Sequence, residues 1–205
     1  MDKSLYPEDP AWLEKLRKMH PFKLFIYVAI IGIVMMFLFL SGSFAISKHG
    51  EKYFVPNYFT FSTILLLLSS FTISRVMFFY KKDNMLKLHR SMVYTFFLAL
   101  AFTWSQMKGW KSLNENGIYF LGEASGSYLY LLSGLHLLHF FGGLIYFLFM
   151  YFRVFNAYRD KVKNLIFVTD PYEKMRLELL VIYWHFMDAL WLLLYLVFML
   201  PSLKH

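Results

Sequence analysis

Cysteine is absent from this chain of 205 residues, and charged residues are scarce at 17%. Without thiolates the chain cannot ligate an iron–sulfur cluster, form a thiolate copper or zinc site, attach a c-type haem or close a disulfide. Soluble domains are about one quarter charged. The shortage of charge, with a hydrophobic fraction of 59% and a mean hydropathy of +0.47, therefore excludes an ordinary soluble domain and predicts a membrane protein.

The sequence contains several long apolar runs. Five stretches are apolar over roughly the 20 residues that a helix needs to cross a bilayer. They are residues 22–47, 57–80, 91–108, 127–152 and 175–200. Because the connections between them are short, we predict an all-α integral membrane bundle of five transmembrane helices. Residues 22–205 then form the transmembrane domain, and residues 1–21 form a cytoplasmic interfacial segment with a helix start at Asp9-Pro10.

The basic residues predict the orientation. The formal net charge of +8 raises nucleic acid as a partner, but 16 of the 21 lysines and arginines lie on one side of the predicted membrane: before the first span, in the connections after the second and fourth spans, or in the span ends that adjoin these segments. Basic loops stay in the cytoplasm. We therefore expect a cytoplasmic N-terminus, a periplasmic C-terminus and no nucleic-acid partner.

Ionisable side chains inside the spans are the strongest functional indicators, because burying them in hydrocarbon is costly. Asp188 is the one acidic residue deep within a predicted span. His185 precedes it by three residues, and His136 and His139 repeat that spacing in the preceding span, at similar depth. Two interpretations remain open from the spacing: a metal or haem site, or a polar cluster whose members bond one another.

Aromatic residues and one arginine complete the candidates. Trp184, Trp191 and Tyr195 fall on the same helical stripe as Asp188, which predicts a seam where two helices pack. Arg153 ends the fourth predicted span on the cytoplasmic side, where arginine binds lipid phosphate or anchors a helix end.

Two segments resemble subunit III of the haem-copper terminal oxidases. Residues 133–144 read SGLHLLHFFGGL, and residues 183–192 read YWHFMDALWL, which is similar to the family's Trp-His-Phe-x-Asp-x-x-Trp signature. The resemblance extends to Ser69-Ser70 and to Gln106 with Trp110, and it covers residues 21–200. The five-helix form resembles the bacterial members and implies a bacterial inner (cytoplasmic) membrane.

The resemblance implies a non-redox subunit of an oxygen-reducing, proton-pumping complex such as cytochrome c oxidase. Haem and copper are then expected in partner subunits, with subunit I as the main contact and subunit II nearby, and no metal or other cofactor in this chain. His136, His139, His185 and Asp188 become structural polar groups with no catalytic role. Arg153 matches a family arginine that pairs with a phospholipid headgroup, so phospholipid is the expected ligand.

The chain departs from the family at two places. Many members carry a carbodiimide-reactive glutamate in the helix that matches residues 22–47, where this chain has no acid. Many also have Gln-x-x-Glu where this chain has Gln106-Met107-Lys108-Gly109. A proton role of the first carboxylate is therefore not carried over, and we expect carbodiimides to leave residues 22–47 unlabelled.

Other functions stay open as alternatives. Within the same superfamily, the runner-up is subunit III of a quinol oxidase or a relative associated with nitric oxide reductase, because the electron donor binds other subunits and this sequence does not identify it. A di-haem anchor is excluded, since His185 is the one histidine in the predicted spans outside the 136/139 pair. A small proton or solute transporter, which belongs to another class, is motivated by Asp188 alone.

Overall fold

The regular structure of the protein is helical. The computed structural model describes residues 20–47, 54–122 and 124–199, and the helices in those ranges are α2 (Pro21–Ser47), α3 (Asn57–Lys81), α4 (Met85–Glu115), α5 (Ala124–Arg159), α6 (Lys161–Thr169) and α7 (Pro171–Met199). The predicted all-α class is confirmed for these residues. The predicted interfacial helix at Asp9-Pro10 lies outside them.

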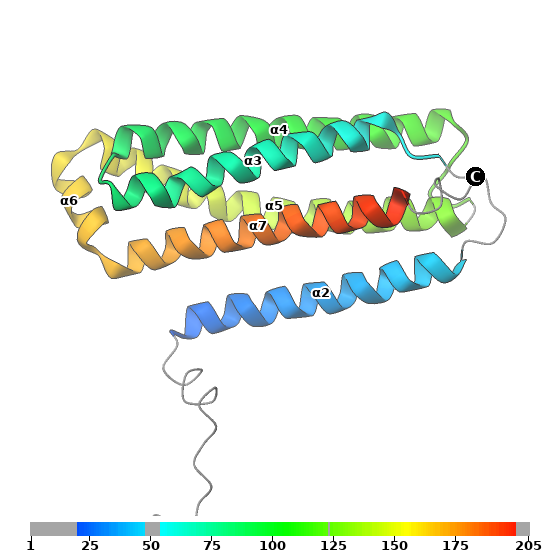
Figure 1. The fold of residues 1–205 in the computed structure, drawn as a ribbon, viewed down its shortest axis with the longest axis horizontal. Helices are drawn as coiled ribbons and strands as arrows, with labels where there is room; N and C mark the ends of the chain where they lie inside the picture. Colours follow the sequence, from blue (N-terminus) through cyan, green and yellow to red (C-terminus); the bar gives the residue numbers. More distant parts are fainter. Residues whose placement is uncertain (1–19, 48–53, 123, 200–205) are drawn as a thin grey trace, which may run out of the picture.

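The long helices run side by side along the long axis of the molecule, with α3 and α4 at one edge of the view, α5 and α7 in the middle and α2 at the other edge (Figure 1). α3, α4, α5 and α7 share the core, and α2 packs against α5 and α7 on the outer side of the bundle. The short α6 lies across one end, which we call the α6 end, beside the turn between α3 and α4. The hydroxyl of Tyr80 ties α3 to this helix by donating to the carbonyl oxygens of Phe167 and Val168, at 3.3 and 3.2 Å.

Helices α2, α3, α5 and α7 are long and apolar enough to cross a membrane. The predicted third span corresponds to α4, which is 31 residues long but carries more polar side chains. Several of these bond the neighbouring helix: the Ser105 hydroxyl donates to the carbonyl oxygen of Tyr58, and the Gln106 amide donates to the Ser62 hydroxyl, both at 2.9 Å. Four spans are thus supported, and the fifth and the orientation of the termini stay predictions.

Short polar residues set the helix boundaries at the α6 end. Asn84 caps α4 by accepting from the Lys87 amide at 3.1 Å, and Asp160 caps α6 by accepting from the Val162 amide at 2.9 Å. The Asp170 carboxylate accepts from the Tyr172 amide at 2.8 Å, and α7 begins at Pro171, as expected for a capping aspartate followed by proline at the first helical position. The sequence did not predict α6, and it placed the start of the fifth span at residue 175.

Gly109 allows α3 and α4 to approach closely. A Cβ at this position would overlap Cε1 of Phe59, whose ring is completely buried. We therefore expect Gly109→Ala to lower the free energy of unfolding in detergent by about 1–3 kcal/mol, the usual cost of overpacking a core. Thermal unfolding measures the effect. The control is Gly142→Ala, where a Cβ meets nothing within 4 Å, and equal melting temperatures for the two variants would contradict the close approach.

Candidate functional site

A row of three hydrogen bonds joins α3 to α7, two of them buried and the third exposed. The indole nitrogens of Trp184 and Trp191 donate to the hydroxyls of Ser69 and Thr63, at 2.9 and 3.1 Å. The Tyr195 hydroxyl bonds that of Thr60 at 2.8 Å. We call these three pairs the α3–α7 seam. The predicted aromatic stripe of Trp184, Trp191 and Tyr195 therefore lies along α3, and the polar group of each side chain forms a hydrogen bond with a hydroxyl of α3.

His185 and Asp188 lie beside the α3–α7 seam but on its outer side. Both ring nitrogens of His185 bond α3: Nδ1 lies 2.7 Å from the Ser70 hydroxyl and Nε2 lies 3.1 Å from that of Ser74. Neither carboxyl oxygen of Asp188 has a hydrogen-bond partner among the residues that the structure describes. The side chain of Asp188 is nevertheless buried, with 8% of its surface exposed.

The other two histidines contact different parts of the bundle. His136 is completely buried among the rings of Phe102, Phe140 and Trp191, and neither ring nitrogen has a hydrogen-bond partner within the described ranges. His139 packs against Phe37 of α2, and its Nδ1 lies 2.7 Å from the carbonyl oxygen of Leu135.

The four candidate residues are therefore not one cluster. No hydrogen bond joins any two of the side chains of His136, His139, His185 and Asp188. Within residues 20–47, 54–122 and 124–199 no group of three histidine or acidic side chains is placed to hold a metal ion. Equal depth in the sequence did not bring the side chains together, because residues three apart on a helix diverge by about 60° and here contact different neighbours.

Gln106 and Trp110 connect α4 to its neighbours. The Gln106 amide nitrogen donates to Ser62 of α3, and the Trp110 indole donates to the Ser133 hydroxyl of α5, both at 2.9 Å. Ser133 belongs to the first of the two motifs that carry the family resemblance. In this bundle Gln106, Trp110 and Ser133 therefore form hydrogen bonds that connect neighbouring helices.

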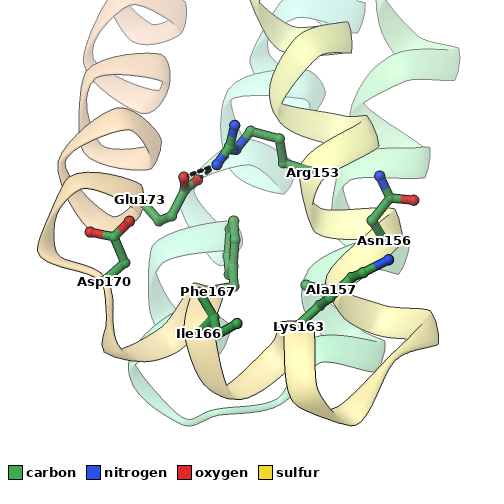
Figure 2. Close-up of a pocket in the computed structure, with 8 residues that line it drawn as sticks. All are labelled: Arg153, Asn156, Ala157, Lys163, Ile166, Phe167, Asp170 and Glu173. Atoms are coloured by element: carbon green, nitrogen blue, oxygen red, sulfur yellow. Dashed lines mark hydrogen bonds and ion pairs between the residues drawn. The ribbon is translucent and has the colours of Figure 1, made fainter.

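An ion-pair cluster lies at the α6 end (Figure 2). Arg153 of α5 binds Glu173 of α7 through two nitrogens, Nε donating to Oε2 at 2.9 Å and Nη2 donating to Oε1. Arg176 also donates to Glu173 Oε1, at 2.8 Å. The glutamate is 2% exposed, whereas Arg153 and Arg176 are 41% and 35% exposed, so one buried anion is held between two half-exposed cations.

A pocket of about 260 Å³ opens next to this cluster. Its lining combines the paired Arg153 and Glu173 with the polar side chains of Asn156, Lys163 and Asp170 and with the ring of Phe167 (Figure 2). A second, apolar pocket of about 250 Å³ lies between α2, α5 and α7. It is lined by Phe22, Phe25, Ile26, Ala29, Gly142, Gly143, Tyr146 and Tyr183.

The sequence analysis did not single out Glu173, and of the hydroxyl partners on α3 it named only Ser69 and Ser70, as part of the family resemblance. Glu173 stands three residues after the helix-capping Asp170, a spacing that predicts a capping role rather than an ion pair. The α3 partners did leave a signal. Thr60, Thr63, Ser70 and Ser74 fall at i, i+3, i+10 and i+14, which places them on one helical face.

The comparison with protein families agrees with these motifs. The family model described as "Cytochrome c oxidase subunit III" matches residues 51–202. The chain belongs to this family. The match includes α3 to α7 and therefore the α3–α7 seam, His185, Asp188 and the Arg153–Glu173 pair, while α2 precedes it. The resemblance inferred from the two motifs is confirmed.

Individual relatives include both kinds of oxidase subunit. The chain is 31% identical to "Probable cytochrome c oxidase subunit 3" of Mycobacterium tuberculosis over 135 residues, which cover 66% of this chain and 62% of that one. It is 26% identical to "Cytochrome bo(3) ubiquinol oxidase subunit 3" of Buchnera aphidicola over 184 residues, 87% of this chain and 92% of the relative. The protein of that name from Pseudomonas putida is 31% identical over 163 residues, 77% of this chain and 72% of the relative.

Proposed function

We propose that this chain is subunit III of an oxygen-reducing haem-copper oxidase in a bacterial inner membrane. The match of residues 51–202 to the subunit III family carries the proposal. In that complex the chain holds no redox centre: haem and copper reside in the partner subunits, and the chain stabilises subunit I, its main contact, beside subunit II. The bundle itself supports a structural role, because its buried polar side chains mostly bond neighbouring helices.

Phospholipid is the ligand that we propose for the α6 end. Arginine has five N–H donors, of which Arg153 uses two on Glu173, so three remain for a phosphate. Lys163 and Asn156 line the same pocket and add further donors. The apolar pocket between α2, α5 and α7 suits an acyl chain. This apolar pocket adjoins the ion-pair cluster, since Tyr146 lines the pocket and donates to the carbonyl oxygen of Arg176 at 3.1 Å.

Co-purification tests the proposed function. The chain is tagged at its C-terminus, extracted in mild detergent, and a reduced-minus-oxidised spectrum is recorded of whatever it retains. We expect haem bands and cyanide-sensitive oxygen uptake, both lost when the chain is stripped from its partners. A colourless chain without partners would overturn the proposal and favour transport. Haem that stays with the stripped chain would instead make His136, His139 and His185 ligands.

The electron donor is a separate question for the same preparation. Relatives of this chain are named as subunits of cytochrome c oxidase and of ubiquinol oxidase. Oxygen uptake is therefore measured once with reduced cytochrome c and once with ubiquinol. Activity with one donor alone assigns the complex to that class.

A further inference from the structure

The outer side of α3 and α4, at one edge of the bundle in Figure 1, is exposed along much of its length. Eight large exposed side chains lie there, four from each helix or its cap: Leu68, Phe71, Arg75 and Lys82 from α3, and Lys87, Arg90, Tyr94 and Phe97 from α4. Their spacings are i, i+3, i+7, i+14 and i, i+3, i+7, i+10, which place each set on one helical face. We call this surface the outer α3–α4 face.

Charged and apolar side chains occupy different parts of this face. The hydroxyls of Thr72 and Thr95 bond each other at 2.8 Å and fix the register of the two antiparallel helices. Arg75 and Arg90 lie about 4.5 and 7.5 Å of helix rise from this pair, toward the α6 end, and the two lysines lie further in the same direction. The four apolar side chains lie around the pair, where they line a groove of about 390 Å³. We call these parts the basic end and the α3–α4 groove.

The basic end lacks an anion. None of its four cations forms an ion pair with an acidic side chain in the described part of the chain. From Arg75 to Arg90 the sequence has five basic residues and one acidic residue, Asp83. Arg75 lies nearest to the groove: its guanidinium is 4.7 Å from the ring centroid of Phe71, which lines the groove one turn further from the α6 end. A cation within a membrane span is costly without an anion, so we expect one to come from outside the chain.

An anionic phospholipid matches both parts of the face. Arginine binds phosphate well, and basic sites between membrane-spanning helices bind anionic headgroups. The order also agrees, because the cations lie nearer the helix ends and the groove lies nearer the middle of the helices, as a headgroup and its acyl chain do in a bilayer. We propose that the outer α3–α4 face binds one anionic phospholipid, whose phosphate pairs with Arg75 and whose acyl chain lies in the α3–α4 groove. None of these residues lines the two pockets described above, and the site does not depend on the oxidase function.

Lipid titration of the purified full chain tests the charge of the ligand. The chain is freed of lipid in detergent and titrated separately with phosphatidylglycerol and phosphatidylcholine, and native mass spectrometry counts the bound molecules. We expect tighter binding of phosphatidylglycerol, and in Arg75→Gln a fall of this preference by about fivefold, the contribution of one basic residue near a membrane surface. Without a preference in the unmodified chain the proposal is wrong, and an acidic side chain of a partner's helix becomes the candidate anion.

Arg159→Gln is the matched control for the charge. Arg159 also lies over a phenylalanine ring, 5.6 Å from that of Phe155, and has no acidic partner among the described residues, but it lines none of the three pockets named here. The Arg153 site is present in both variants and contributes equally to their lipid binding. An equal loss of preference in Arg75→Gln and Arg159→Gln would show general attraction by positive charge and would overturn the site.

A second pair of variants tests the groove without changing any charge. Leu68→Trp fills the α3–α4 groove, so we expect weaker binding of both lipids and an unchanged preference for phosphatidylglycerol. Leu68 is 51% exposed, so the larger ring does not disturb the core. Leu138→Trp is the control, because Leu138 is 64% exposed on α5 and does not line the groove. If the two tryptophan variants bind lipid equally well, the acyl chain does not lie in the α3–α4 groove.

Discussion

Replacing Trp191 with alanine is expected to produce the largest loss of stability in the bundle. Trp191 is completely buried, its ring centroid lies 5.6, 5.5 and 5.1 Å from those of Phe59, Phe102 and His136, and its indole donates to Thr63. Trp→Ala in a soluble core costs about 3–5 kcal/mol. In a bilayer part of that cost disappears, because lipid tails are as apolar as the core. The lost packing and the cavity remain, so we expect about 3 kcal/mol.

Thermal unfolding in detergent, followed by circular dichroism, measures the effect. Two variants separate its causes. Trp191→Phe keeps most of the ring volume and removes the bond to Thr63, so we expect it to cost about 1 kcal/mol, the usual net value of a hydrogen bond. Trp104→Ala is the control, because Trp104 is 56% exposed. If Trp191→Ala melts at the same temperature as Trp104→Ala, the packing of α3, α4, α5 and α7 around Trp191 is not as described.

The Arg153–Glu173 pair leads to a second large effect, on lipid content as well as on stability. We expect Arg153→Ala to lower the amount of co-purifying phospholipid and to shorten the working lifetime of the oxidase during turnover. It also leaves the buried Glu173 with Arg176 as its one remaining arginine partner in the described part of the chain. Losing one partner of a fully buried ion pair costs about 3–5 kcal/mol. Arg153 is 41% exposed and Arg176 remains, so we expect a smaller loss of about 1–2 kcal/mol.

Glu173→Gln separates the lipid role from the structural role. The amide removes the anion and frees Arg153 for phosphate, so we expect lipid retention to stay equal or to rise while the melting temperature falls. Phosphorus analysis of the purified protein measures retention. The control is Arg159→Ala, since Arg159 lies over Phe155 at 5.6 Å and has no acidic partner among the described residues. If Arg153→Ala and Arg159→Ala retain equal lipid, Arg153 is a structural residue alone.

The helices could be predicted from the sequence because their signals are local. Apolar runs long enough to cross a bilayer marked α2, α3, α5 and α7. Hydropathy is a weaker indicator of a membrane span for α4. Its polar residues lower its hydropathy, yet several of them bond α3, and the hydropathy of a segment does not record which side chains face a partner helix.

The family, too, was determined by the sequence, because the two motifs have a characteristic order and spacing. The grouping of the polar residues could not be determined from the sequence. His136, His139, His185 and Asp188 lie at similar depth, but helix rotation decides which neighbour each side chain meets, and depth along the chain contains no information about rotation. Only the tertiary structure placed His185 on the serines of α3 and buried both oxygens of Asp188 without a partner among the described residues. Only the tertiary structure, likewise, turned a capping glutamate into the buried partner of two arginines.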